Sequence, residues 1–131
     1  MSILPKGDKI VYPSGKLVVI RSTTDANRAW LYTQHSANVT AVAAAPSGEW
    51  IASGDERGQV RIWGVMPEHT LKLETVALGG KVMDIAWSGD GQRLCAVGEG
   101  REAFGKVFTW DSGNSLGSID SHSKRIITCA F

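Results

Sequence analysis

The sequence has 131 residues and a net charge of +1, and 43% of its residues are hydrophobic while 21% are charged. This composition is typical of a globular protein and excludes an intrinsically disordered one. The balanced charge creates no field that would favour DNA, RNA or an acidic membrane as a partner. No apolar run approaches the roughly 20 residues of a membrane helix, and the first residues lack the features of a secretory signal. We therefore expect a cytoplasmic protein.

Short apolar runs alternate along the chain with clusters of Gly, Ser, Asp and Pro, and none shows a sustained period of 3.6 residues. Such runs and turn residues predict an all-β chain. In chain order, the expected strands are residues 9–12, 16–21, 28–33, 38–45, 49–54, 58–64, 69–77, 81–87, 92–98, 104–110, 115–120 and 125–131.

Two parts of the chain repeat one pattern. At a spacing of 43 residues, Val39, Val42, Gly48 and Ile51 correspond to Val82, Ile85, Gly91 and Leu94. At a spacing of 47 residues, Gly58, Val60 and Trp63 correspond to Gly105, Val107 and Trp110. The difference predicts a four-residue insertion in the second copy, within the segment VGEGREAF at 97–104.

A repeat of about 40–45 residues with four strands is typical of a β-propeller blade. We interpret 34–77 and 78–120 as two blades, 1–33 as strands b, c and d of a preceding blade, and 121–131 as the first strand of a following one. Because propellers typically have four to eight blades, about three blades' worth of strands predicts an incomplete ring and hence a piece of a longer protein. The alternative is strand exchange between two chains, which would give a six-bladed ring.

The segment QHSANVTAVAAAPSGEWIASGDERGQVRIW resembles a WD40 repeat, and the resemblance implies a hydrogen-bonded set of His, Ser or Thr, Asp and Trp inside each blade. The matching structural residues are His35, Ser53, Trp63, Trp110, Asp111 and His122. The match is partial, because Arg57 stands where the turn Asp is expected and Gly64 replaces the Asp after Trp63. The second unit has Gly79 and Gly80 where His is expected, so the polar network is expected to be incomplete.

A longer resemblance covers nearly the whole chain. The segments YPSGKLVVIR, APSGEWIASGDERGQVRIW and VGEGREAFGKVFTWDSGNSLGSIDSHSK are similar to the actin-interacting protein 1 family of WD-repeat proteins. The resemblance implies a long chain with two seven-bladed propellers that promotes disassembly of cofilin-decorated actin filaments. It also implies actin and cofilin as partners, a cytoskeletal location, and a match to part of the first propeller only.

The charged insertion is the candidate partner-binding site. In a propeller, the b–c and d–a connections emerge on one face, so the inserted loop should lie near the preceding b–c turn and near Lys81. The candidate residues are Glu99, Arg101, Glu102, Phe104, Lys106, Asp55, Glu56, Arg57 and Lys81. The family resemblance implies that Glu99 and Glu102 act in filament disassembly. In the alternative interpretation, the loop is solvated and its charges pair with each other, which contributes about 0–1 kcal/mol per pair.

The sequence contains no pattern that predicts a metal site, a catalytic nucleophile or a phosphate-binding loop. The histidines at 35, 69 and 122 are too far apart for a metal-ligand pattern, and neither a G-x-S-x-G motif nor a complete phosphate-binding loop occurs. We expect no enzyme activity, no cofactor, no metal and no small-molecule ligand. Two alternatives stay open: a generic WD-repeat scaffold that binds another protein, and an enzyme that uses the central funnel of the propeller.

Overall fold

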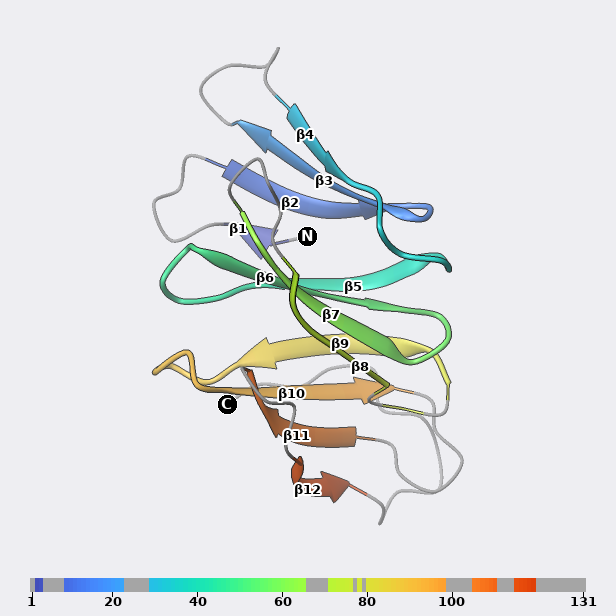
Figure 1. The fold of residues 1–131 in the computed structure, drawn as a ribbon, viewed down its shortest axis with the longest axis vertical. Helices are drawn as coiled ribbons and strands as arrows, with labels where there is room; N and C mark the ends of the chain where they lie inside the picture. Colours follow the sequence, from blue (N-terminus) through green and yellow to red (C-terminus); the bar gives the residue numbers. More distant parts are fainter. Residues whose placement is uncertain are drawn as a thin grey trace.

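The computed structural model describes residues 2–3, 9–22, 29–65, 71–76, 78, 80–98, 105–110 and 115–119, and all regular structure in them is β. The strands form three antiparallel sheets of four strands, stacked face to face (Figure 1). Their bounds are β1 Ser2–Ile3, β2 Lys9–Ser14, β3 Leu17–Ser22, β4 Ala29–Tyr32, β5 Val39–Ala44, β6 Trp50–Asp55, β7 Gln59–Gly64, β8 Leu71–Val76, β9 Val82–Trp87, β10 Arg93–Gly98, β11 Gly105–Thr109 and β12 Ser115–Ile119. The predicted all-β class and the WD40-type blades are confirmed.

Each sheet is a meander, because the strands pair in their sequence order. The turn between the first two strands is repeated in the middle and third sheets. In the middle sheet the Gly48 amide donates to the Ala45 carbonyl at 2.9 Å, and in the third sheet the Gly91 amide donates to the Ser88 carbonyl at 2.9 Å. Both glycines have positive φ, 77° and 71°, which only glycine adopts without strain. The turn chemistry is thus part of the repeat.

The first sheet has one strand more than the sequence predicts. Residues Ser2–Ile3 pair antiparallel with β2, with Ser2 opposite Val11 and Ile3 opposite Ile10. The expectation of three strands in this sheet is therefore wrong, because two residues are too short a run to show strand periodicity. The further strand expected at 125–131 lies outside the described residues.

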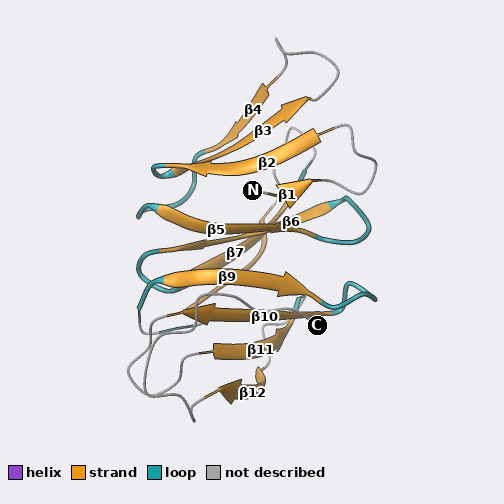
Figure 2. Ribbon diagram, turned by 180° about the vertical axis from the view of Figure 1, so that it is seen from behind, coloured by secondary structure: helices purple, strands orange, loops and turns teal. Residues whose placement is uncertain are grey.

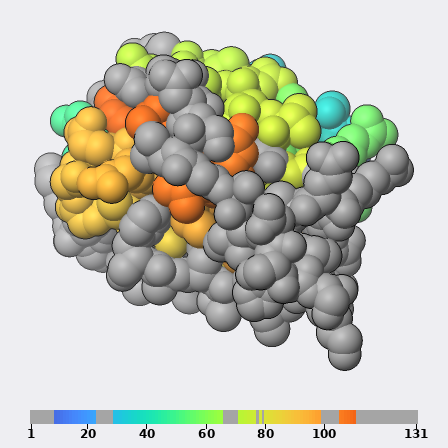
Figure 3. Space-filling view, turned by 90° about the horizontal axis from the view of Figure 1, so that it is seen from below, coloured from blue at the N-terminus to red at the C-terminus, as the bar shows by residue number. Residues whose placement is uncertain are grey.

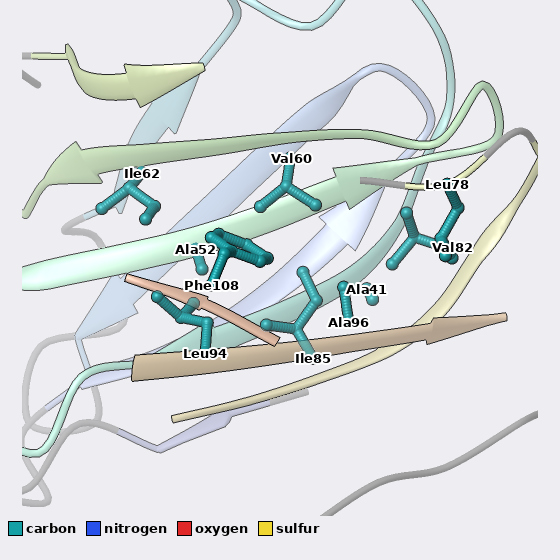
Figure 4. Packing of buried hydrophobic residues seen from close by; sticks show 10 residues of the cluster. All are labelled: Ala41, Ala52, Val60, Ile62, Leu78, Val82, Ile85, Leu94, Ala96 and Phe108. Atoms are coloured by element: carbon teal, nitrogen blue, oxygen red, sulfur yellow. The ribbon is translucent and has the colours of Figure 1, made fainter. Parts of the chain in front are cut away.

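The middle sheet is buried on both faces, which is the packing of a propeller blade between two neighbours. One face packs on the first sheet through the cluster of Val11, Val18, Ile20, Tyr32, Val39, Val42, Ile51 and Trp63. The other packs on the third sheet through Ala41, Ala52, Val60, Ile62, Leu78, Val82, Ile85, Leu94, Ala96 and Phe108 (Figure 4). Successive side chains along β6 and β7 pack alternately into the two clusters, because neighbouring side chains of a strand point to opposite faces of the sheet.

The register of the third sheet corrects one predicted equivalence. Trp63 lies opposite Ile51 in the middle sheet, and Phe108 lies opposite Leu94 in the third. Because Ile51 and Leu94 are repeat equivalents, Phe108 and not Trp110 occupies the place of Trp63. Both rings are 0% exposed. The insertion before β11 is therefore two residues rather than four, as these paired positions show.

Candidate protein-interaction surface

Connections from the middle and third sheets meet at one edge of the stack. We name this the b–c edge; it comprises the turn 55–58, residues 78 and 80–82, and the strand ends Gly98 and Gly105 (right side of Figure 1). The Leu78 amide donates to the Gly58 carbonyl at 3.3 Å, which ties the segment between the sheets to the turn. Gly98 is paired with Val82, so the inserted loop leaves its sheet beside the same segment.

Close backbone contact fixes the point at which the inserted loop begins. A Cβ atom at Gly98 would lie 2.7 Å from the Met83 amide nitrogen, so a side chain cannot be placed there without moving the backbone. The ladder between β9 and β10 also shifts its register between Val97 and Gly98. Such a bulge redirects the chain at the end of a strand. The loop residues Glu99, Arg101, Glu102 and Phe104 lie outside the described residues.

Five of the predicted partner-binding residues are described at or near this edge, and four of them are at least partly exposed. Glu56 and Arg57 are exposed in the 55–58 turn, and Lys81 and Lys106 are half-buried. The turn is held by backbone hydrogen bonds: the Gly58 amide donates to the Asp55 carbonyl at 3.2 Å within the turn, and the Glu56 amide donates to the carbonyl of Asn38, just before β5, at 3.0 Å. Lys106, the second residue of β11, has its Nζ atom 5.9 Å from the Phe108 ring centre. These residues place charges of both signs around the base of the inserted loop.

Asp55 is not part of this exposed surface, which corrects the prediction that it binds a partner. Its side chain is buried, at 0% exposure. One carboxylate oxygen accepts hydrogen bonds from the backbone amides of Arg57 (2.9 Å) and Gln59 (3.1 Å), and the other lies 3.3 Å from His35 Nδ1. Asp55 therefore supplies the turn carboxylate that the sequence comparison expected at position 57.

The polar network of the middle blade is complete. Trp63 Nε1 donates to Ser53 Oγ at 2.9 Å, and Ser53 Oγ lies 2.5 Å from His35 Nε2. One proton arrangement satisfies every atom: the Ser53 hydroxyl donates to Nε2 of a neutral imidazole, whose Nδ1–H donates to Asp55. Ser, His and Asp stand here in the order of a hydrolase triad, but Ser53 is 0% exposed and already accepts the indole proton. The set is structural.

The same network joins the middle blade to the first. The Trp63 and Tyr32 rings stack with centres 4.0 Å apart and planes within 2° of parallel. Arg61 Nε donates to the Tyr32 hydroxyl at 2.7 Å, and the Arg61 guanidinium also pairs with Glu74 at 2.7 Å. Burial raises the pKa of Tyr32, so its hydroxyl keeps its proton at neutral pH.

In the third blade, apolar residues replace the network. Ala96 takes the register position of Ser53, since Ser53 pairs with Val42 and Ala96 with the equivalent Ile85. Phe108 takes the position of Trp63, as described above. Because both the donor and its acceptor are lost together, no polar atom is left without a partner, and such a double replacement costs little. The predicted blade residues Asp111 and His122 lie outside the described residues.

Acidification should destabilise the middle blade. Burial lowers the pKa of His35 below its ordinary value of 6.5, and this outweighs the opposing effect of the Asp55 carboxylate. Below about pH 6.5 the His35 imidazole therefore binds a proton in the unfolded chain but not in the folded chain. The free energy of unfolding is highest above that pH and falls as the pH decreases towards the pKa of His35 in the folded chain. The loss is at most about 1.4 kcal/mol per pH unit.

Urea unfolding between pH 7.5 and 5.5 tests this expectation. His35→Gln is the matched control, because the amide cannot titrate, and its free energy of unfolding should fall less steeply over the same range. Equal slopes for the two proteins would contradict the assignment.

The described residues hold no group of three or more His, Cys, Asp or Glu side chains that could bind a metal ion. They also include no helix with the length and apolar character needed to cross a membrane.

Comparison with known proteins agrees with this geometry. The family described as WD domain, G-beta repeat matches residues 27–64. WD repeat-containing protein 1 of Rattus norvegicus is 48% identical over 93% of this chain, and the 66 kDa stress protein of Physarum polycephalum is 48% identical over 97%. Actin-interacting protein 1-2 of Arabidopsis thaliana is 41% identical over 96% of the chain.

The chain spans about a fifth of the length of these relatives, 20–21%. Together with the three stacked sheets, the matches identify the chain as a run of WD40-repeat blades, part of a β-propeller, homologous over nearly its whole length to WD repeat-containing protein 1 and actin-interacting protein 1.

Proposed function

We propose that this chain is an actin-regulatory WD-repeat segment that acts in the cytoplasm by protein contact and not by catalysis. The observation that carries the proposal is its 41% identity, over 96% of its length, to a relative named as actin-interacting. In the proposed mechanism, the b–c edge contacts an actin filament that carries cofilin and thereby promotes disassembly of the filament.

The b–c edge is the best-supported contact surface because it gathers charges of both signs on a firmly held backbone. Glu56 and Arg57 are exposed there, and the inserted loop adds Glu99, Arg101 and Glu102 in sequence. Charges of this kind set the orientation and rate of association more than its strength. Phe104, at the end of the loop, would supply an aromatic anchor of the type that dominates interface energies.

Reversing both loop acids should abolish cofilin-dependent filament disassembly. The variant Glu99→Lys/Glu102→Lys, made in the longest form of the protein that contains this chain, would place like charges where the proposal requires unlike ones. We expect at least about a tenfold weaker co-sedimentation with cofilin-decorated filaments and an almost unchanged melting temperature.

Glu49→Lys is the control on the opposite edge, because it reverses one exposed carboxylate there, which is half the charge change of the double variant. Normal disassembly by the double variant, or an equal loss in the control, would contradict the role of the b–c edge. Co-sedimentation with and without cofilin separates a contact to actin alone from a contact to both proteins. Binding to neither would favour a scaffold for another protein.

A further inference from the structure

A cleft of about 260 Å³ opens between the middle and third blades at the edge opposite the proposed actin contact. We name this the a–b edge; it comprises the turns 45–49 and 88–92, which lie together on the right side of Figure 2. The lining residues are Ala45, Pro46, Ser47, Glu49, Trp50, Trp87, Asp90, Gly91, Gln92 and Trp110. Three indoles and two carboxylates thus border one small space.

The three indole rings form a fixed aromatic wall. The Trp50 and Trp110 ring centres are 5.4 Å apart, with planes inclined at 51°. The Trp87 ring is anchored across the blade interface, because its Nε1 donates to the Ala43 carbonyl at 3.1 Å. All three residues are half-buried and line the cleft.

The blade repeat does not explain this concentration of indoles. The ladder places Trp87 opposite Leu94 and places Ala44 opposite the equivalent Ile51, so the middle blade has an alanine where the third has Trp87. Trp110 likewise corresponds to Val65. The Val65 amide donates to the carbonyl of Glu49, just before β6, and the Trp110 amide donates to the carbonyl of Gln92, just before β10. The three indoles flank the core cluster between the two blades, but the repeat places an indole at these two positions in the third blade only.

The charges at the rim favour a cation. Glu49 is exposed, and no cation among the described residues pairs with its carboxylate. Hydrogen bonds from Ser88 Oγ (2.5 Å) and the Gln92 amide (3.0 Å) lower the pKa of Asp90 and keep it ionised. Arg93 approaches Asp90 only to 3.9 Å, and both side chains are more than half exposed, so this pair is weak.

One cation of the chain already uses the aromatic wall. Lys72 Nζ, from β8, lies 5.1 Å from the centre of the Trp110 ring. Figure 3 shows the yellow-green atoms of β8 beside the orange atoms of residues 105–110. Among the described residues, no cation lies over Trp50 or Trp87. The indoles of this wall therefore attract cations, and the Trp50 and Trp87 rings can still receive one from a partner.

We propose that this cleft is a docking site for an arginine side chain of a partner protein, stacked on Trp50 and Trp87 and paired with Glu49. Arginine fits better than lysine because its planar, weakly hydrated guanidinium stacks on aromatic rings and pairs with carboxylates at the same time. The volume of about 260 Å³ suits one side chain and lies below the range of about 300–1,000 Å³ usual for small-molecule sites.

Titration of the protein with the blocked peptide acetyl-Gly-Arg-Gly-amide tests the proposal, followed by NMR of the indole Nε1–H signals. The matched probe carries citrulline in place of arginine, which keeps the shape and removes the charge. We expect the arginine peptide to shift the Trp50 and Trp87 signals and to bind about tenfold more tightly than the citrulline peptide, the gain usual for a desolvated cation over an indole.

Two exposed-residue variants complete the design. Glu49→Gln should weaken arginine-peptide binding about two- to fivefold, whereas Glu56→Gln, on the b–c edge, should leave it unchanged. Equal affinity for the two peptides, unshifted Trp50 and Trp87 signals at millimolar peptide, or an unchanged affinity in Glu49→Gln would each overturn the proposal. The NMR titration measures this site without filaments, so its outcome is independent of the co-sedimentation assay that tests the b–c edge.

Discussion

Replacing Phe108 with alanine should lower the free energy of unfolding by about 3–5 kcal/mol. The ring is 0% exposed and lies in the cluster that joins the middle and third sheets, between Leu94 and residues of β6 and β7 (Figure 4). Its removal leaves a cavity at the interface between two blades, where the sheets cannot close together without breaking their ladders. Urea unfolding of the wild-type and variant proteins measures the loss.

Trp110→Ala is the informative control, because the sequence repeat assigns to Trp110 the place that Phe108 holds in the structure. Trp110 is half-buried at the margin of the core cluster, where its ring lies beside the inclined Trp50 indole and Lys72. Its loss should cost only about 1 kcal/mol. A larger loss for Trp110→Ala than for Phe108→Ala would contradict the register of β10 against β11 and restore the four-residue insertion.

The sequence could not decide between these two registers for a physical reason. A strand shifted by two residues keeps the same side chains on the same face, so the hydrophobic pattern is unchanged. Phe108 and Trp110 are both aromatic and two residues apart, and Trp110 is followed by Asp111 as in the WD motif. Only the pairing with β10, which depends on tertiary packing, distinguishes them.

For the polar network of the middle blade, three of the four residues are predicted from the sequence, and Asp55 is missed. The WD40 resemblance predicts that His35, Ser53 and Trp63 form a hydrogen-bonded set, and the structure joins them. Asp55 is predicted at the surface because it belongs to the b–c turn, together with Glu56 and Arg57. Two amides of the turn and the His35 imidazole draw it inward instead. The available signal in the sequence was the uncharged run at 51–54 that leads directly into Asp55, and the structure buries this run together with Asp55.

The two edges of the stack carry different chemistry, although the same repeat builds both. The b–c edge gathers exposed charges around the insertion, and the repeat comparison pointed to it because an insertion interrupts the pattern. The a–b edge has turns of equal length in both blades, marked by Gly48 and Gly91. Its indoles come from three separate strand ends, Trp50, Trp87 and Trp110, so only the stacking of the blades brings them together.

Gly58→Ala should lower the free energy of unfolding by about 3 kcal/mol, because two independent constraints meet at this residue. Its φ of +86° is a conformation that an L-residue adopts only with strain. A Cβ atom there would also lie 2.7 Å from the Leu78 carbonyl carbon and 2.8 Å from the Gly80 oxygen. Both atoms belong to the backbone, so relief requires moving the segment between the sheets.

Gly15→Ala separates the two constraints. Gly15 has a φ of +60° in the turn between β2 and β3, but nothing lies within 4 Å of its Cβ position. Its replacement should therefore cost only the backbone strain, about 1–2 kcal/mol. Urea unfolding compares the two variants, and equal losses would show that the turn 55–58 does not rest against the 78–82 segment. Since that contact holds the b–c edge together, Gly58→Ala should also weaken filament co-sedimentation at a temperature where the variant remains folded, while Gly15→Ala should not.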